Sequence, residues 1–181
     1  MSFPHSDRLI FRNMTDADLD DMAAMLADAD VMEYYPRPKS REEAQGWIDW
    51  NKRNYLERGY GLWVIETKAG EFVGDCGLTW QAVNGRPELE VGYHVRAKMQ
   101  GRGYATEAAS ACLDFARNVL GAAHLVAIIH PDNRASRGVA EKIGLEFEED
   151  DRGGAIDVRS VYGLRLWPVL PSRMLRELNS H

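Results

Sequence analysis

This sequence lacks long apolar runs, clustered cysteines and a basic leader. No stretch reaches the roughly 18–20 apolar residues that cross a bilayer, and its start, Met1 to Asp7, has neither a basic nor an apolar segment. We therefore expect no membrane span and no secretory leader, and a cytoplasmic protein. Cys76 and Cys112 lack the spacing of metal ligands, which favours reduced thiols and implies no metal.

An excess of positive charge is also absent. The net charge is -6, and no basic stripe carries interleaved aromatics, so nucleic acid is a poor candidate partner. Acidic residues are scattered except in the run 146–151. That run predicts either a solvated turn or an acidic rim that attracts a cationic substrate.

What is present fits one globular domain over residues 1–181. Hydrophobic residues make up 45% of the chain and charged residues 28%, enough to bury a sizeable core. Strand-like apolar runs are expected at residues 8–12, 62–65, 72–80, 88–95, 124–129, 145–149 and 159–166. Helical patterns are expected at residues 15–26, 40–58, 103–120 and 133–143. This order predicts a mixed α/β sheet, with a loop at 31–39.

The stretch Gln100–Ala105 lies between a strand pattern and a helix pattern and contains Gly101 and Gly103. A helix start leaves backbone N–H groups unpaired, and glycine lets an anion approach them closely. The stretch therefore predicts a phosphate-binding turn; the alternative is an ordinary connecting turn with no binding role.

Other nucleotide motifs fit less well. The Gly-x-x-x-x-Gly-Lys-Ser/Thr pattern is absent, and a dinucleotide fingerprint would need glycine or alanine where Thr106 stands. The acidic residue expected about 20 positions later is missing, because Gly121–Ala123 lies there. A nicotinamide-dependent Rossmann enzyme is kept only as an alternative.

The sequence from Asp7 to Leu166 resembles the GCN5-related N-acetyltransferases (GNAT), and within them the RimJ/RimL type that acetylates ribosomal-protein N-termini. Gln100-x-x-Gly103-x-Ala105 matches the superfamily's acetyl-CoA pyrophosphate signature. Further matches to the RimJ/RimL type are Arg8–Arg12, Ser40–Ala44 with Trp47-Ile48, Gly103–Ala108, Asn133–Ser136 and Val139–Gly144.

The resemblance implies a GNAT fold: a mostly antiparallel sheet of six or seven strands, splayed between strands four and five, with about four helices. It also implies acetyl-CoA as the acetyl donor. Its pantetheine would lie along residues 93–95 and its pyrophosphate at the amides of 101–105. The residues so assigned to the cofactor are Tyr93, His94, Val95, Gln100, Gly101, Arg102, Gly103, Tyr104, Ala105, Thr106, Asn133 and Ser136.

The implied reaction is direct acetyl transfer to a primary amine, which needs a base because such an amine is protonated near pH 7. Alternation in the strand places Glu88, Glu90, Gly92 and His94 on one face. Glu90 is our candidate base, acting directly or through water, and His94 is a candidate for proton relay. The alternatives are a solvated or salt-bridged glutamate and a structural histidine.

Many relatives protonate the leaving thiolate with a tyrosine, but Ala140 occupies the matching position here. The RimJ/RimL-like pattern suggests Ser136 instead, unless it is a helix-surface serine. Asn133 could hold the pantetheine, cap its helix, or do both.

The acceptor cannot be read from the residues: a protein N-terminus, an amino acid, a polyamine and an aminoglycoside are all amines. We expect the loop 31–39 to face the acceptor, and the resemblance suggests a possible homodimer. The non-enzymatic alternative is an acyl-CoA-binding sensor that has lost turnover.

Overall fold

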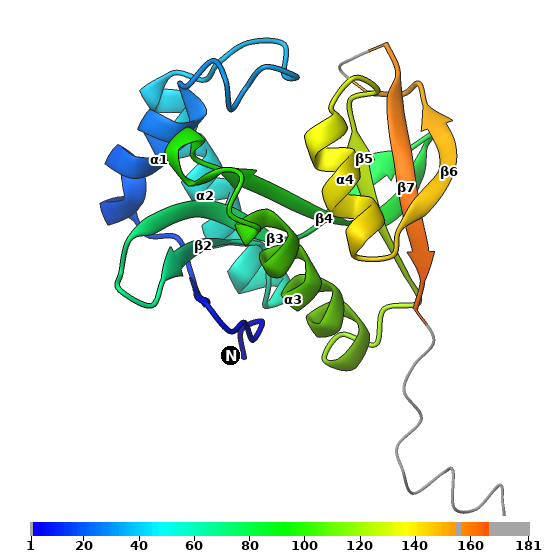
Figure 1. Cartoon of the computed structure of the whole chain (residues 1–181), viewed down its shortest axis with the longest axis horizontal. Helices are drawn as coiled ribbons and strands as arrows, with labels where there is room; N and C mark the ends of the chain where they lie inside the picture. The colour runs from blue at the N-terminus through cyan, green and yellow to red at the C-terminus, as the bar shows by residue number, and fades with distance from the viewer. Residues whose placement is uncertain (1, 155–156, 167–181) are drawn as a thin grey trace, which may run out of the picture.

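The chain folds into a seven-stranded sheet with helices on both faces (Figure 1). The computed structural model describes residues 2–154 and 157–166; the rest of the expected domain 1–181 lies outside the described residues. The strand order is β1-β2-β3-β4-β5-β7-β6. The strands are β1 Leu9–Arg12, β2 Leu62–Thr67, β3 Phe72–Val83, β4 Arg86–Val95, β5 His124–Ile129, β6 Glu146–Asp151 and β7 Arg159–Arg165. The helices are α1 Leu19–Leu26, α2 Arg41–Arg58, α3 Tyr104–Asn118 and α4 Arg134–Lys142, with 3₁₀ turns η1 Asp16–Asp18 and η2 Ala97–Met99.

Local capping explains where the first helices begin. Ser40 Oγ accepts a hydrogen bond from the Glu43 N–H (3.2 Å), and the Glu43 carboxylate accepts one from the Ser40 N–H (2.8 Å), so α2 starts with the expected capping box. Thr15 was expected to begin an α-helix, but it precedes η1 instead. The Asp18 carboxylate accepts the Thr15 N–H at 2.7 Å and also pairs with Arg12; the α-helix α1 then follows η1 directly, from Leu19.

The two faces of the sheet are covered differently. In Figure 1, α3 lies in front of β3 and β4, and α2 lies behind them. Cys76 of β3 and Cys112 of α3 meet in the buried layer between them, with their Sγ atoms 3.6 Å apart and both thiols free. On the opposite face, Trp47 of α2 donates its indole N–H to Asp75 of β3 at 2.9 Å. Polar residues of β3 and β4 therefore lie beneath α2, and apolar ones lie beneath α3.

The acidic run 146–151 forms strand β6, so the expectation of a solvated turn is wrong. Four of its carboxylates have basic partners: Glu148 contacts His124, Glu149 contacts Arg86, Asp150 contacts Arg152, and Asp151 contacts Arg159. Asp151 is fully buried and also accepts the Asn84 N–H at 2.8 Å. Pairing with β7 and these contacts order the run despite its charge.

The sheet is splayed between β4 and β5, as expected. These strands form the parallel pair of the sheet, and they pair only at Glu90 and Val126, whereas β3 and β4 pair along ten positions from Gly74↔Val95 to Val83↔Arg86. The antiparallel pairing of the other strands excludes the Rossmann alternative, which requires a parallel sheet. Beyond Glu90 the two strands diverge into the V that Figure 1 shows.

Candidate active site

The divergence leaves one edge of β4 without a strand partner beyond Glu90. The Arg96 N–H donates to the Val73 carbonyl at 3.0 Å, toward β3. Because backbone groups alternate along a strand, those of Val95 and Tyr93 point to the other edge, into the V. The Val95 carbonyl accepts the side-chain amide of Gln100 at 2.9 Å. The open edge can pair with an extended ligand as a further strand would.

The predicted phosphate turn directly follows β4 and η2. Gly101 and Gly103 have φ values of 73° and 81°, in the left-handed region that favours glycine. Within the described residues, the N–H groups of 101–106 donate to no protein acceptor. The turn is exposed and lies at the positive end of the α3 dipole. It can therefore bind an anion through its backbone.

Arg8 fixes this turn from the N-terminal segment, which the sequence analysis missed. Its guanidinium donates to the Arg102 carbonyl (3.1 Å) and to the Glu107 carboxylate (2.5 Å), and lies 4.8 Å from the centre of the Tyr104 ring. Glu107 also accepts the Arg8 backbone N–H at 2.7 Å. The contact orders the turn and the first helical residues before any ligand binds.

α4 faces β4 across the V through Tyr93. The Tyr93 hydroxyl donates to the Ser136 carbonyl at 2.8 Å, and the Ser136 N–H donates to Asn133 Oδ1 at 2.9 Å. Asn133 is therefore the N-cap of α4, one of its two expected roles. Within the described residues the half-buried Ser136 hydroxyl has no protein partner, and Ala140 is buried in the core. Ser136 is thus the hydroxyl of α4 available to a ligand in the V.

Glu90 lies at the point where β4 and β5 separate. It is half-buried on the α2 side, with its carboxylate 3.5 Å from the Thr79 hydroxyl. Burial raises the pKa of Glu90 to about 7, against the lowering effects of the Arg159 charge and the Ile128 N–H. A carboxylate with this pKa can accept a proton near neutral pH.

Glu88 and His94, expected on the same face as Glu90, have different surroundings. The Glu88 carboxylate contacts His124 Nδ1 at 2.9 Å, and His124 Nε2 contacts Glu148 at 3.0 Å, at the closed end of the V. His94 is buried, with Nδ1 2.7 Å from Asp75 and Nε2 2.6 Å from the Tyr35 hydroxyl. Glu88 thus links β4 to β5 and, through His124, to β6. His94 belongs to a separate hydrogen-bonded chain.

Asp75 was not among the site residues predicted from the sequence, although a signal was present. Asp75 is a lone carboxylate within the otherwise apolar run of β3 and is fully buried. A buried charge requires a partner, and its register neighbour on β4 is His94. Tyr35 lies in the loop 31–39, and nothing local to it indicates that its hydroxyl meets a histidine 59 positions away.

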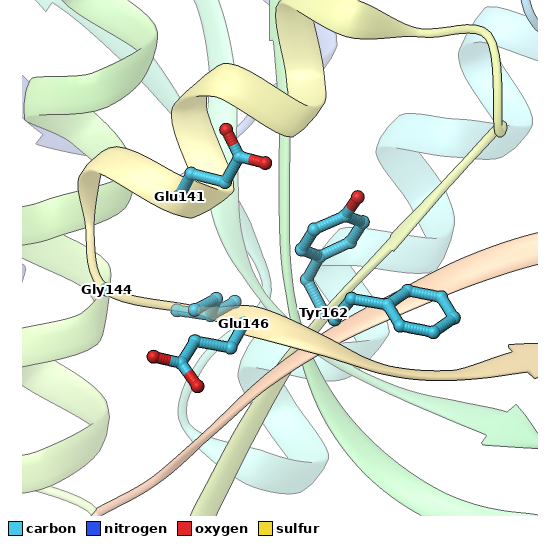
Figure 2. A pocket seen from close by; sticks show the side chains of 6 residues that line it. Glu141, Gly144, Glu146 and Tyr162 are labelled. Atoms are coloured by element: carbon cyan, nitrogen blue, oxygen red, sulfur yellow. The ribbon is translucent and has the colours of Figure 1, made fainter.

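A separate depression lies at the C-terminal end of α4, away from these residues (Figure 2). Its lining residues are Glu141, Gly144, Leu145, Glu146, Phe147 and Tyr162. None of them belongs to the candidate site, and its two glutamates oppose the binding of a phosphate.

In the described parts of the chain, no group of three or more His, Cys, Asp or Glu side chains is arranged to hold a metal ion. No helix among the described ones has the length and apolar character of a bilayer span.

Comparisons with known proteins identify the family of this chain. A family model described as an acetyltransferase (GNAT) domain matches residues 8–146. The uncharacterized protein YkkB of Bacillus subtilis (strain 168) is 41% identical over 151 residues, which cover 81% of this chain and 87% of YkkB.

Solved structures share the fold. An acetyltransferase from Agrobacterium tumefaciens str. C58 superposes with a TM-score of 0.76 at 27% identity, over 91% of this chain and 96% of that one. RimL, a ribosomal L7/L12 alpha-N-protein acetyltransferase in complex with coenzyme A, has a TM-score of 0.71 at 19% identity, over 89% and 96% of the two chains. The chain belongs to the GNAT acetyltransferase family.

Proposed function

We propose that this protein transfers an acetyl group directly from acetyl-CoA to a primary amine, as an N-acetyltransferase of the RimJ/RimL type. One observation carries the proposal: a turn with two left-handed glycines and free amides follows a strand whose edge opens into a V. The open edge of β4 is a site for an extended chain, and the turn next to it is a site for an anion. Acetyl-CoA has an amide-bearing pantetheine arm joined directly to a pyrophosphate, so its two parts match these two neighbouring sites.

In this proposal the donor is held mostly by backbone groups. The amides of residues 101–106 bind the pyrophosphate, with the Arg102 side chain adding charge. The edge of β4 at Tyr93–Val95 pairs with the pantetheine, and Asn133 and Ser136 face it from α4. Gln100 supports the site by tying the turn to the Val95 carbonyl. Bound acetyl-CoA supplies the activated thioester, and its carbonyl oxygen is stabilised by the Val95 N–H.

Glu90 is the proposed base. At pH 7 the acceptor arrives as an ammonium ion, and its nitrogen must lose a proton before it can attack the thioester. A pKa of about 7 leaves a large fraction of Glu90 ionised at that pH. The Ser136 hydroxyl stabilises the departing thiolate in place of the tyrosine that Ala140 replaces.

The acceptor is proposed to enter on the α2 side, beside Glu90 and the loop 31–39. A carboxylate at this entrance favours a cationic amine over a neutral one. RimL acts on the N-terminus of a ribosomal protein, which makes a protein N-terminus the first acceptor class to test.

A turnover screen tests the proposal. Acetyl-CoA consumption would be measured with four acceptor classes: N-terminal peptides, amino acids, polyamines and aminoglycosides. We expect turnover with at least one class and a loss of about 10²–10⁴-fold in kcat for Glu90→Gln, the usual contribution of a general base. Acetyl-CoA binding without turnover on any amine would contradict the proposal and favour the acyl-CoA sensor.

A further inference from the structure

A hydrogen-bonded chain runs from the core to the acceptor side of β4. It joins Asp75 Oδ1 to His94 Nδ1 (2.7 Å) and His94 Nε2 to the Tyr35 hydroxyl (2.6 Å). The second Asp75 oxygen accepts the Trp47 indole N–H at 2.9 Å. The three members come from β3, β4 and the loop before α2, so only the folded sheet brings them together.

The chemistry of these groups fixes the direction of each hydrogen bond. An ionised carboxylate only accepts, so the His94 Nδ1–H must donate to Asp75. In the neutral imidazole the other nitrogen, Nε2, is then an acceptor, and it accepts the Tyr35 O–H. The Tyr35 oxygen keeps its lone pairs free for a donor outside the chain.

Tyr35 is the member that reaches the surface. It is 41% exposed, whereas His94 is 8% exposed and Asp75 is 0% exposed. Both His94 ring nitrogens have partners within the chain. Any proton that passes between His94 and an acceptor must therefore travel through the Tyr35 hydroxyl.

We propose that Tyr35, His94 and Asp75 form a proton relay that removes a second proton from the acceptor nitrogen, in addition to the one taken by Glu90. The relay rests on the proposed function. Tyr35 touches the amine, His94 stores the proton, and Asp75 is a positioning residue that holds the imidazole in the required tautomer. The three side chains are arranged as a hydroxyl, imidazole and carboxylate triad, with the hydroxyl passing a proton rather than attacking.

The acceptor nitrogen loses two protons in the reaction, and the proposal assigns each of them its own base. The ammonium gives its first proton to Glu90, and the resulting amine forms a C–N bond to the thioester carbonyl carbon. The nitrogen then bears a positive charge and passes a proton to the Tyr35 oxygen, while the Tyr35 proton moves to His94 Nε2. The C–S bond breaks, its electron pair stays on sulfur, and the thiolate takes a proton from water. Glu90 and His94 return their two protons to water, so one proton is released overall.

The groups that face His94 predict how the relay depends on pH. They are Asp75 on β3, Tyr35 and Lys39 on the loop, Trp47 on α2, and Glu90 on β4. Burial lowers the pKa of His94, but the Asp75 and Glu90 charges outweigh burial and raise it above its usual value. Burial also raises the pKa of Tyr35, as do Glu90 and Asp75, so this hydroxyl stays protonated and acts only as a conductor. The relay therefore operates when His94 is neutral, and activity rises with pH.

The test measures kcat against pH, with acetyl-CoA and amine both saturating, in the wild type, Tyr35→Phe and a matched control. Tyr60→Phe is the control, because it also removes one tyrosine hydroxyl, that of a half-buried side chain that accepts the Trp80 indole N–H at 2.8 Å. We expect Tyr35→Phe to lower kcat about 10²-fold, the lower end of general acid–base effects, with acetyl-CoA affinity unchanged. On the acid side, log kcat should rise with a slope near two in the wild type and Tyr60→Phe, and near one in Tyr35→Phe.

Each result decides a different claim. An unchanged kcat and slope in Tyr35→Phe, or a raised amine KM alone, would overturn the relay while leaving acetyl transfer intact. Asp75→Asn provides a second variant that should lower kcat without changing the acetyl-CoA KM. Absence of turnover in the wild type would instead contradict the proposed function itself.

Discussion

The backbone conformation of Gly101 offers a direct test of the phosphate turn. Alanine at this position would keep the chain length and add one methyl group, and apart from its two chain neighbours the added Cβ would meet no atom within 4 Å. The cost is therefore conformational, because φ is 73° and a left-handed residue with a Cβ costs roughly 1–2 kcal/mol. If the turn of the free variant relaxes to avoid this strain, binding of acetyl-CoA must restore the left-handed conformation. The same energy then appears as an increase of about 5- to 30-fold in the Kd of acetyl-CoA.

Gly121→Ala is the matched control for Gly101→Ala. Gly121 follows α3, has a φ of 62°, and its added Cβ also meets nothing within 4 Å. Thermal unfolding would measure the strain that stays in the free protein, at about 2–4 °C per kcal/mol for a chain of this size. Calorimetry would measure the Kd of acetyl-CoA and of acetyl-pantetheine, which has no pyrophosphate. Of these combinations, only Gly101→Ala with acetyl-CoA should show an increased Kd. Equal Kd values for acetyl-CoA in both variants, when Gly101→Ala keeps the wild-type unfolding temperature, would refute the pyrophosphate assignment.

Three further predictions concern the carboxylates and a histidine. Glu90→Gln should lower the acid-side slope of log kcat against pH from near two to near one while leaving the Kd of acetyl-CoA unchanged, because the ionised carboxylate is the active form and its pKa is about 7. The slope that remains belongs to His94, and an unchanged slope near two would assign the lost titration to another group. Asp151→Asn should lower the free energy of unfolding by about 3 kcal/mol, since it disrupts a buried ion pair. Burial raises the pKa of Asp151, but hydrogen bonds from Asn84 and Arg159 outweigh burial and hold this pKa below its usual value. The difference in free energy of unfolding between variant and wild type, measured by denaturant titration, should therefore shrink as the pH falls through the lowered pKa. His124→Gln should be most destabilising below about pH 6.5. Partial burial lowers the pKa of His124, but Glu88 and Glu148 outweigh burial and raise this pKa. The stabilisation that protonated His124 gives the folded protein is therefore lost as the pH rises through the raised pKa. A constant difference between pH 6 and pH 9 would show that the charge of His124 contributes nothing.

The elements that follow local rules were the ones predictable from sequence. Ser40 and Asn133 cap their helices as expected, because a short polar side chain before an apolar helical pattern acts within three residues. The turn at Gly101 and Gly103 was predictable for the same reason. Alternation along β4 also placed Glu90 and His94 on one face correctly.

The contacts that were not predictable join distant segments. Arg8 meets Glu107 across 99 positions, and Tyr35 meets His94 across 59 positions. Neither contact leaves a local pattern, since a lone arginine or tyrosine is compatible with many positions on the surface. Such pairs depend on strand order, which periodicity does not determine.

Glu90 and His94 show how strand order assigns different roles to residues with the same local signature. Both are polar residues on the α2 side of β4, four positions apart. At Glu90 the neighbouring β5 begins to separate, so the carboxylate borders the V and is only half-buried. At His94, β3 presents Asp75 directly opposite and the loop before α2 places the Tyr35 hydroxyl beside Nε2. Glu90 can therefore meet an amine directly, whereas His94 can exchange a proton only through Tyr35. This difference predicts that replacing Glu90 acts on the first deprotonation and replacing Tyr35 acts on the second.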